Sequence, residues 1–428
     1  MKQTHAPKGT FDILPYGAPE SWQLSALWLF LEKTAAETAA DFGYRKIATP
    51  IYEMTELFDR GVGETTDIVS KEMFTFQDRG NRSVSLRPEG TASAARAFIE
   101  HHLDQQGPIH KFYYIGPMFR YERPQSGRYR QHHQFGVEAF GASAPEQDAE
   151  AIELLVEFYR RIGLKGLTVH LNSVGDVPSR LAYREALQNY FRPFFGDLSE
   201  DSRIRFEKNP LRILDSKDPK DRQMIEGAPS ILDHLSTESK AHFEQVCALL
   251  DRIEVPYQID DRIVRGLDYY HNTVFEVLAG DLGAQNTVGA GGRYDGLIKQ
   301  LGGPDLPGIG FATGLERVAQ VFLNQGNAVP SGPCPLVYLI PLGDEARNEV
   351  FSLTTRCRRA KIPADCERVS KKVPAAIQNA LRAGARYACV IGSEELKSNQ
   401  AKIKNLETRE ETPFSLANII PTLTQLIQ

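Results

Sequence analysis

Residues 111–140 read KFYYIGPMFRYERPQSGRYRQHHQFGVEAF, and this stretch predicts the centre of the fold. Two aromatic-rich runs flank a polar loop containing proline and glycine, which is the pattern of a β-hairpin with a long connection. On the returning run, strand alternation places Gln134, Gly136 and Glu138 on one face and apolar residues on the other. The apolar face can pack into a core, whereas the polar face suits a small cationic or hydrogen-bonding ligand.

The same hairpin concentrates positive charge in its loop. Arg120 stands where the outgoing run gives way to a segment that holds Arg123, Arg128 and Arg130. An arginine fork matches phosphate oxygens in both geometry and charge. We therefore interpret the hairpin as a site that holds an anion beside a small polar molecule. The alternative is a solvated hairpin with scattered surface charge.

Length and composition indicate a globular protein of several domains. At 428 residues the chain exceeds one ordinary core, so two or three domains are expected. A hydrophobic content of 41% and a charged content of 25% are those of soluble proteins. No apolar run approaches the ~18 residues of a membrane span. The five cysteines lack zinc-site or disulfide-framework spacing, which fits an intracellular, reducing compartment. A net charge of -5 restricts RNA contact to local basic patches.

Two further segments supply candidate site residues. SLRPEGT ends a strand in a turn before an alanine-rich helix, and it places Glu89 near the helix N-terminus. Glu89 is either a favourable charge for the helix dipole or a carboxylate that receives a substrate ammonium group. GIGFATGLERVAQVF passes from a small-residue strand to a helix near Gly314, so Arg317 falls in the first turn and opposes the dipole. This unfavourable position hints at a bound anion, although many exposed arginines occupy it without one.

Composition shifts predict the domain boundaries. Pro50 interrupts the strand pattern GYRKIATPIYE, which therefore lies at a sheet edge or an interface. Residues 178–255 turn helical and charged, which predicts an inserted helical subdomain. A Gly/Pro/Asn linker then divides residues 1–330 from residues 331–428, where strands and helices alternate as in a small α/β domain. The basic clusters of this second domain are either a solvated face or a surface for a phosphate backbone.

Nearly the whole chain resembles the histidyl-tRNA synthetases, a family of class II aminoacyl-tRNA synthetases. GYRKIATPIYE, FRYERPQSGRYRQHHQFGVEAFG and GIGFATGLERV resemble the three class motifs, of which the first forms the dimer interface. RGLDYY and GGRYDGL are more specific, because they resemble two peptides characteristic of the histidine enzymes. The resemblance implies an α+β fold, with a six-stranded antiparallel sheet flanked by helices, an inserted helical domain and a C-terminal α/β anticodon-binding domain.

The function that the resemblance implies is ATP-dependent activation of L-histidine to histidyl-adenylate and transfer to the 3′ end of tRNA(His). It implies a cytoplasmic homodimer with no membrane association. Mg²⁺ is expected with ATP, although no acidic cluster in the sequence marks a metal site. The alternative is a non-catalytic, histidine-sensing regulatory paralogue. Such paralogues usually lack the C-terminal domain and vary at the adenylating arginines, both of which this chain retains. A prolyl or threonyl synthetase is a third possibility, and RGLDYY argues against it.

Individual roles follow from the resemblance alone. Arg120 would hold the α-phosphate of ATP, Arg265 the α-phosphate and the histidine carboxylate, and Arg317 the γ-phosphate, so these three arginines are the expected catalytic and ATP-binding residues. The expected histidine-binding residues are Glu89, Gly90, Thr91, Gln134, Glu138, Tyr269 and Tyr270. His132 and His133 are interpreted as solvent-exposed loop residues. The chain departs from the family at His271 and Asn272, which lie past the pocket residues, so we expect little effect there.

Overall fold

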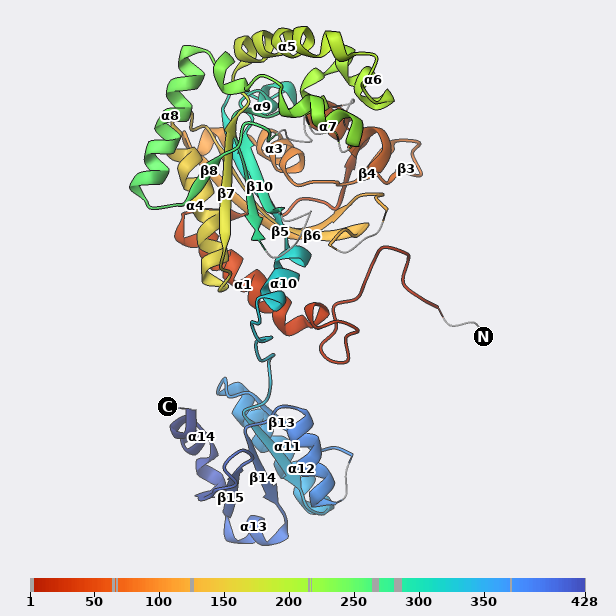
Figure 1. The fold of residues 1–428 in the computed structure, drawn as a ribbon. Helices are drawn as coiled ribbons and strands as arrows, with labels where there is room; N and C mark the ends of the chain where they lie inside the picture. The colour runs from red at the N-terminus through yellow and green to blue at the C-terminus, as the bar shows by residue number, and fades with distance from the viewer. Residues whose placement is uncertain are drawn as a thin grey trace. The chain divides into compact units, whose positions relative to one another are not determined.

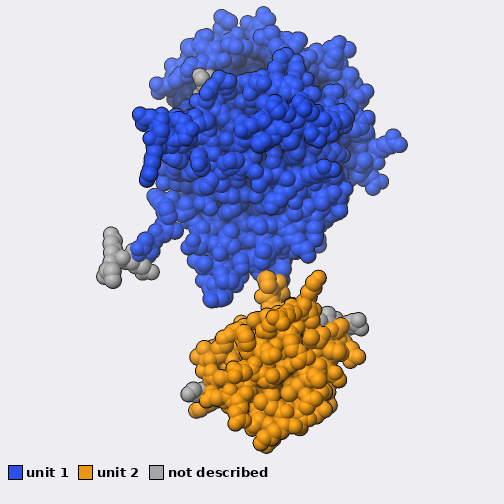
Figure 2. Space-filling view, turned by 180° about the vertical axis from the view of Figure 1, so that it is seen from behind, with its two compact units in different colours: residues 1–330 blue, residues 331–428 orange. Residues whose placement is uncertain are grey.

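The computed structural model describes residues 4–63, 66, 68–123, 127–214, 216, 218–263, 269–280, 287–369 and 372–427. The chain divides into two compact units, residues 1–330 and residues 331–428, which Figure 2 shows in different colours. Figure 1 labels the secondary-structure elements of both units. Among the described residues, no helix combines the length and the apolar character that a membrane crossing requires.

The first unit is built on a sheet of eight strands in the order β1-β5-β6-β11-β10-β9-β7-β8. The inner strands from β5 to β7 pair antiparallel throughout. The strands are β1 (Arg45–Lys46), β5 (His110–Phe119), β6 (Gln131–Phe140), β7 (Leu167–Ser173), β8 (Tyr257–Ile259), β9 (His271–Ala279), β10 (Thr287–Arg293) and β11 (Gly308–Gly314). The predicted hairpin is confirmed, because β5 and β6 pair over their whole length.

The expectation of a six-stranded sheet is wrong at the two edges. Two short strands extend the six antiparallel strands, and each pairs in parallel, β1 with β5 and β8 with β7. An exposed edge presents unpaired backbone groups, which a short extended segment can satisfy. Runs of two and three residues carry no periodic signal, so the number of strands was not predicted, although the pattern GYRKIATPIYE did predict a strand at an edge or an interface.

Helices cover both faces of the sheet and create two main cores. The helices of this unit are α1 (Ser25–Asp41), α2 (Thr55–Phe58), α3 (Thr91–Glu100), α4 (Pro145–Arg161), α5 (Val177–Phe191), α6 (Glu200–Lys208), α7 (Pro219–Glu226), α8 (Thr237–Arg252), α9 (Leu297–Gln300) and α10 (Leu315–Asn324). Residues of α1, α4, α8 and α10 form one core with Phe135, Val137 and Ala139 of β6. This is the apolar face that strand alternation predicts, so the opposite face of β6 is left to line the site.

The helical segment between β7 and β8 contributes to two different cores. Helix α8 packs through Phe243, Val246 and Leu250 into the core that it shares with α4. Helices α5 and α6 instead bury Tyr183 and Phe206 in a second core, together with residues of α3 and α9. Figure 1 shows α5, α6 and α7 grouped at the top of the view. The last helix of the predicted insertion is therefore packed as part of the main body.

Pro50 separates two strands that belong to different sheets. Before it, β1 forms one edge of the large sheet. After it, β2 (Tyr52–Met54) forms the edge of a three-stranded sheet in the order β2-β4-β3, with β3 (Thr75–Gln77) and β4 (Ser83–Leu86). The predicted edge position is confirmed for both strands, because proline can neither donate to a ladder nor continue one.

The second unit is an α/β domain with a five-stranded sheet in the order β13-β12-β14-β15-β16. Strands β13, β12 and β14 run parallel, and β15 and β16 add antiparallel pairs. Its elements are β12 (Val337–Pro341), α11 (Asp344–Arg359), β13 (Ala364–Cys366), α12 (Val373–Arg382), β14 (Tyr387–Ile391), α13 (Ser393–Ser398), β15 (Gln400–Asn405), β16 (Glu411–Ser415) and α14 (Ile419–Ile427). Leu339, Leu353 and Ile391 lie in its core.

Candidate active site

A cavity of about 590 Å³ lies against the polar face of the large sheet in the first unit. Its walls come from the turn before α3, the β5–β6 hairpin, the segment before β9 and β9 itself, β10, β11 and the first turn of α10. Seven of the predicted site residues line it together: Glu89, Thr91, Arg120, Gln134, Tyr269, Tyr270 and Arg317. Arg265 lies outside the described residues. The fold thus brings distant parts of the sequence around one space.

The cationic part of the cavity is formed by Arg120 and Arg317. Arg120 follows β5 directly, and its Nε donates to the carbonyl of Pro88 at 3.0 Å. Arg317 lies in the first turn of α10, as predicted, and donates to the carbonyls of Gly127 at 3.3 Å and Thr287 at 2.7 Å. Neutral carbonyls orient a guanidinium without cancelling its charge, so both groups can attract an anion.

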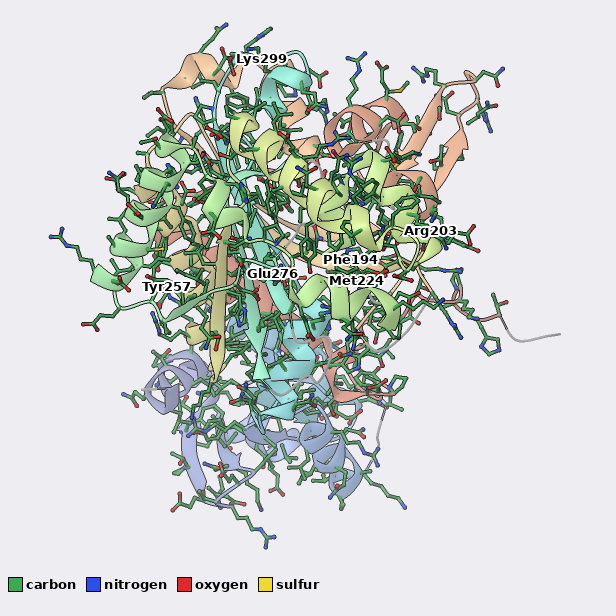
Figure 3. All side chains as sticks on the ribbon, turned by 45° about the horizontal axis from the view of Figure 1, so that its top comes forward. Phe194, Arg203, Met224, Tyr257, Glu276 and Lys299 are labelled. Carbon is green, nitrogen blue, oxygen red and sulfur yellow. The ribbon has the colours of Figure 1, made fainter. Side chains whose placement is uncertain are left out.

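The pKa of Arg317 reflects this environment. Burial lowers it, and the nearby positive charge of Arg128 lowers it further, while Glu122 and Glu276 oppose the shift. Glu276 lies on β9, where Figure 3 labels it, and accepts a hydrogen bond from Thr287 at 2.9 Å. Glu122 pairs with Arg128 at 2.7 Å. The cavity therefore has a positively charged wall with two carboxylates beside it.

Glu89 caps the helix that follows it. Its two carboxylate oxygens accept hydrogen bonds from the backbone amides of Thr91 at 2.7 Å and Ala92 at 2.8 Å. Burial raises the pKa of Glu89, and these hydrogen bonds and the charge of Arg120 act against that shift. The interpretation as a helix-dipole charge is therefore correct. Because the same carboxylate also lines the cavity, it can face a ligand as well.

Glu138 lies beneath the cavity, where three hydroxyls converge on it. Thr91 Oγ1 donates to it at 2.8 Å and Tyr114 Oη at 3.2 Å, and Tyr294 Oη donates to its other oxygen. Burial, with a contribution from the charge of Glu89, raises the pKa of Glu138 to about 8. The Glu138 carboxyl is fully buried, so it fixes the hydroxyls that surround it and is not itself among the described residues that line the space.

Two glycines make room for the Tyr114 ring. A Cβ on Gly90 would lie 2.2 Å from Tyr114 Cζ, and a Cβ on Gly136 would lie 2.4 Å from it. Real side chains do not approach this closely, so both positions require glycine for the ring to reach Glu138. Gly90, expected to bind histidine, is thus in contact with Tyr114 and is not among the described residues that line the cavity.

The apolar wall consists of three tyrosines whose rings meet at tilted or edge-to-face angles. The ring centroids of Tyr269 and Tyr270 lie 4.8 Å apart, and those of Tyr269 and Tyr294 lie 5.5 Å apart. Gln134, in contrast, adds a polar group to the cavity. Its Oε1 is buried and accepts no hydrogen bond within the described part of the chain. A buried acceptor without a partner is costly, which indicates that a ligand donates to it.

The expectation that His132 and His133 are solvent-exposed loop residues is wrong. Both lie on β6, because the strand extends back to Gln131. His132 is half-buried and lines the cavity; burial, together with the charge of Arg120, lowers its pKa to about 3, so it is neutral. His133 is only 17% exposed in its side chain and contacts Glu316 through its backbone amide at 2.8 Å and Nδ1 at 2.9 Å.

Sequence reasoning missed Tyr114 and Tyr294 as site residues. Tyr294 lies within GGRYDGL, one of the two peptides that resemble those of the histidine enzymes, so the sequence did indicate that it belongs to the site. Tyr114 pairs directly with Gly136 across β5 and β6, and a glycine opposite an aromatic residue is the only local sign of its role. The contact of either hydroxyl with Glu138 cannot be predicted without knowledge of the strand register.

An antiparallel sheet with helices on both faces, carrying two arginines and a buried carboxylate around one cavity, defines the catalytic domain of a class II aminoacyl-tRNA synthetase. Residues 28–318 match the family model described as Histidyl-tRNA synthetase, and residues 336–426 match the one described as Anticodon binding domain. The chain belongs to the histidyl-tRNA synthetase family.

Individual relatives agree with this assignment over the full length. The histidine–tRNA ligase of Protochlamydia amoebophila is 52% identical over 97% of this chain and 98% of its own. That of Desulfitobacterium hafniense is 49% identical over 96% of this chain and 95% of its own. The apo crystal structure of S. aureus histidyl-tRNA synthetase superposes with a TM-score of 0.83 at 37% identity, covering 98% of this chain and 100% of that one.

Proposed function

We propose that this chain activates L-histidine with ATP to give histidyl-adenylate, and then transfers the histidyl group to the 3′ end of tRNA(His). In the first step a carboxylate oxygen of histidine attacks the α-phosphorus of ATP. A new phosphorus–oxygen bond forms as the bond to the β-phosphate breaks, and pyrophosphate leaves. In the second step a hydroxyl of the terminal ribose attacks the carbonyl carbon, and AMP leaves. No protein nucleophile is required for either step.

The observation that supports this proposal most directly is the shared cavity of Arg120 and Arg317 with Glu89, Gln134 and Tyr269. Both reactants of the first step are anionic where they meet, so fixed positive charge must hold them together and stabilise the transition state. We assign Arg120 to the α-phosphate and Arg317 to the γ-phosphate. Arg265 is assigned from its sequence motif alone to the α-phosphate and the histidine carboxylate.

The histidine end is assigned to the remaining walls. Glu89 and Thr91 receive the ammonium group, since a carboxylate held by backbone amides is a fixed acceptor for a cation. Gln134 Oε1, which has no partner among the described residues, accepts a hydrogen bond from the substrate. Tyr269 and Tyr270 flank the imidazole, with Gly90 placing the Tyr114 ring behind it. Glu138 acts one layer deeper, through the hydroxyls that it orients.

Magnesium enters this scheme with ATP as part of the substrate. Within the described ranges, no three His, Cys, Asp or Glu side chains gather in a way that could hold a metal ion. Mg²⁺ bound to nucleotide phosphates needs only one or two protein carboxylates. Glu122 and Glu276 line the cavity near Arg317 and fit that requirement. The ion would neutralise charge on the phosphates as pyrophosphate leaves.

The partners and setting that we propose follow the family. The second unit, matched as an anticodon-binding domain, would hold tRNA(His). A homodimer is supported by apolar side chains on the small sheet and directly before it: Ile51, Tyr52, Met54 and Phe76 are 46%, 54%, 47% and 48% exposed. A grouping of this kind on a surface marks an interaction site. We place the reaction in the cytoplasm, where the five free thiols would stay reduced.

A histidine-sensing regulatory role is not favoured by any described feature. The structure of a Bacillus halodurans protein titled as an ATP phosphoribosyltransferase regulatory subunit/histidyl-tRNA synthetase is similar in fold alone, at 22% identity and a TM-score of 0.66. ATP–pyrophosphate exchange by the purified chain across the twenty amino acids tests the proposal. We expect exchange with histidine only, followed by charging of tRNA(His). Histidine binding without exchange would instead support the regulatory role.

A further inference from the structure

The segment that carries the two pocket tyrosines is fixed at its downstream end by an unusual backbone conformation. Tyr269 and Tyr270 line the cavity, and Asn272, two residues further, has φ 50°, in the left-handed region. The pairing of β9 with β10 slips at the same place, from Val274 opposite Gly292 to His271 opposite Arg293. Asparagine tolerates this conformation better than most residues. The bulge therefore sets the direction from which the tyrosines enter the cavity.

The inserted helices leave the main body before α5 and rejoin it at the start of α8. Hydrogen bonds among Asp176, Ser179 and Ser236 join these two ends, and we call this contact the neck. Asp176 caps α5 by accepting a hydrogen bond from the amide of Ser179 at 2.9 Å. Its other oxygen accepts one from Ser236 Oγ, at the start of α8, at 2.7 Å. Burial opposes ionisation here, but these hydrogen bonds lower the pKa of Asp176 to about 2. The two ends of the insertion are thus held to one ionised carboxylate.

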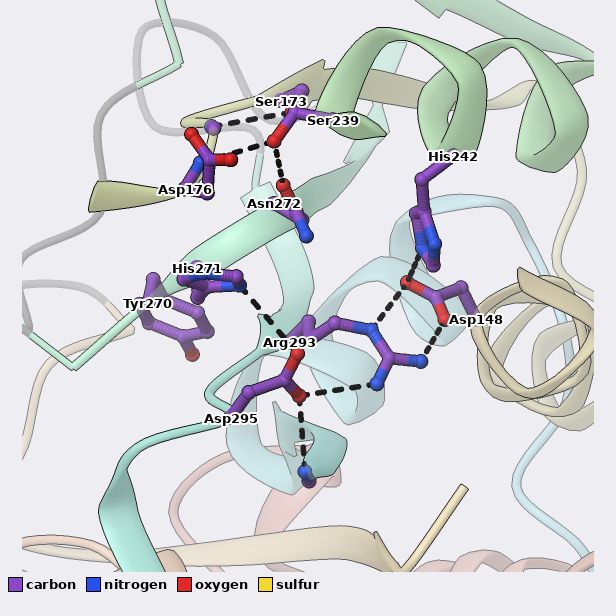
Figure 4. Close-up of polar contacts among 12 residues, drawn as sticks. Asp148, Ser173, Asp176, Ser239, His242, Tyr270, His271, Asn272, Arg293 and Asp295 are labelled. Carbon is purple, nitrogen blue, oxygen red and sulfur yellow. Dashed lines mark hydrogen bonds and ion pairs between the residues drawn. The ribbon is translucent and has the colours of Figure 1, made fainter. Parts of the chain in front are cut away.

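Asn272 is joined to this neck by its side chain and by its backbone. Ser239 Oγ, in the first turn of α8, donates to Asn272 Oδ1 at 2.7 Å (Figure 4). The amide of Asn272 donates to the carbonyl of Gly175 at 3.0 Å, and its carbonyl accepts from the amide of Val174 at 2.8 Å. Ser239 is buried, so its hydroxyl has a fixed direction. The bulge and the neck therefore form one hydrogen-bonded unit.

A second contact reaches the pocket itself. Arg180, in the first turn of α5, donates through Nη1 to the carbonyl of Tyr270 at 3.2 Å. Next to Tyr270 in the chain, His271 Nδ1 lies 3.5 Å from Asp295, which also accepts from Arg293 at 3.1 Å. Figure 4 shows His271 and Asp295 beside the buried Arg293. The segment is therefore held between the insertion and the main sheet.

We propose that the inserted helices position the histidine pocket, with Ser239 and Asn272 acting as the positioning pair that holds Tyr269 and Tyr270 in place. This inference rests on the proposed function, because it takes the tyrosine wall as the histidine pocket. Neither residue of the pair lines the cavity as described, so both act through the segment between them. The pair sets histidine affinity and has less effect on ATP, because Arg120 and Arg317 lie on other elements than the tyrosine segment.

The test compares substitutions of Ser239 and Asn272 with a substitution at the neck. Ser239→Ala removes the donor, together with the acceptor of the Asp176 amide at 3.1 Å, whereas Asn272→Gly removes only the acceptor of the pair and keeps a residue that adopts positive φ readily. We expect each to raise the KM for histidine in pyrophosphate exchange by about fivefold, the effect of one lost hydrogen bond. The KM for ATP should change less than about twofold. The double variant should raise the KM for histidine no more than Ser239→Ala alone does, because the contact between the two side chains is already lost there.

Two controls separate positioning from folding. Ser179→Ala removes two hydrogen bonds of the neck, those to Asp176 and from the Ser236 amide, and keeps the Ser239 and Asn272 side chains, so it should lower the melting temperature without raising the KM for histidine. Asn272→Asp keeps both an acceptor and tolerance of the left-handed conformation, so it should restore histidine binding. An unchanged histidine KM in Ser239→Ala and Asn272→Gly would overturn the inference, even if both variants melted early.

The same measurements distinguish failure of the inference from failure of the proposed pocket. Gln134→Ala changes a side chain that lines the cavity directly. A raised histidine KM in Gln134→Ala, with none in the Ser239 and Asn272 variants, would overturn only the positioning role. No histidine-dependent exchange in the unmodified chain would overturn the proposed function, and the positioning role with it.

Discussion

Thr91 and Glu138, 47 residues apart in sequence, are joined by a hydrogen bond of 2.8 Å from the Thr91 hydroxyl to the buried carboxyl. The bond ties the first turn of α3 to the second half of β6, beneath the cavity. Two tyrosine hydroxyls reach the same carboxyl. Because a buried polar network is stable only when every member has a partner, the floor of the cavity is fixed before a ligand binds.

Removing Arg120 should abolish most adenylate formation. Arg120→Ala loses a fixed charge at the proposed α-phosphate position, and we expect pyrophosphate exchange to fall by a factor on the order of a hundred or more. Arg160→Ala, on the surface of α4, is the matched control, because an exposed ion pair contributes little. Exchange in Arg120→Ala within a few fold of the unmodified chain would remove Arg120 from this role.

The same size of loss is expected for Arg265→Ala, a prediction that rests on the motif RGLDYY alone. Losing one charge partner of the transition state again corresponds to about a hundredfold. Histidine-dependent pyrophosphate exchange measures it, at saturating ATP so that binding and chemistry are separated. Equal exchange rates in the variant and the unmodified chain would show that Arg265 does not stabilise the α-phosphate, and would leave that role to Arg120.

The raised pKa of Glu138 predicts a pH dependence of stability. The value is about 8 in the folded chain against 4.5 for an ordinary glutamic acid, so between these values the folded state binds more protons than the unfolded state. Stability contributed by this group is therefore present below about pH 4.5 and is lost as the pH rises towards 8. Glu138→Gln removes the titration, so its melting temperature should fall less between pH 5 and 8.

Circular dichroism melts at several pH values measure this difference. Glu37→Gln, on α1, is a suitable comparison, since the Glu37 side chain is 60% exposed whereas Glu138 is fully buried. Parallel melting curves for Glu138→Gln and the unmodified chain across this range would show that Glu138 is ionised in the folded state, with its charge stabilised by the three hydroxyls.

The hairpin could be predicted from strand alternation, whereas the convergence of hydroxyls beneath it could not. Gln134 and Glu138 fall on one face because the period of a strand is two, which any reader of the sequence can apply. Tyr294 reaches Glu138 only because β10, β11 and β6 are neighbours in a particular register. Register between distant strands is a property of the whole sheet, and no local pattern contains it.

The two histidines of the hairpin show a case in which composition gave the wrong prediction. His132 and His133 adjoin a loop rich in arginine, so composition favoured an exposed position. In the fold the strand continues through them, and Glu316, 183 residues later, accepts a hydrogen bond from the amide of His133. A polar residue beside a loop is buried when a distant partner satisfies it, which composition cannot reveal.

Adding a methyl group at Gly136 should disturb the site without touching a polar group. A Cβ there would lie 2.4 Å from the Tyr114 ring, so the ring must move away from Glu138. Overpacking of this kind costs about 1–3 kcal/mol of unfolding free energy. We expect Gly136→Ala to raise the KM for histidine as well as to lower stability. Gly196→Ala, where a Cβ would meet nothing within 4 Å, should change neither.

A charge on the small sheet should weaken the proposed dimer. Tyr52 is 54% exposed on β2, and Tyr52→Asp places a carboxylate among the apolar side chains of that sheet. Loss of a buried aromatic anchor typically costs 2 kcal/mol or more, so the dissociation constant should rise by about thirtyfold or more. Light scattering over a dilution series measures it, with Tyr16→Asp, an 81% exposed position, as the control. A monomeric unmodified chain at all concentrations would contradict the proposal at once.

Deletion of residues 331–428 should separate the two chemical steps. The first unit contains the whole described cavity and its own cores, so we expect the shortened chain to keep most of its histidine-dependent pyrophosphate exchange. Aminoacylation should weaken, because the tRNA loses the contacts of the anticodon-binding domain. The binding that the second unit contributes is expected to be partly electrostatic. The KM of the full chain for tRNA should therefore rise steeply with salt, and that of the shortened chain less so. Equal losses of exchange and aminoacylation would show that the second unit supports the fold of the first instead of holding RNA.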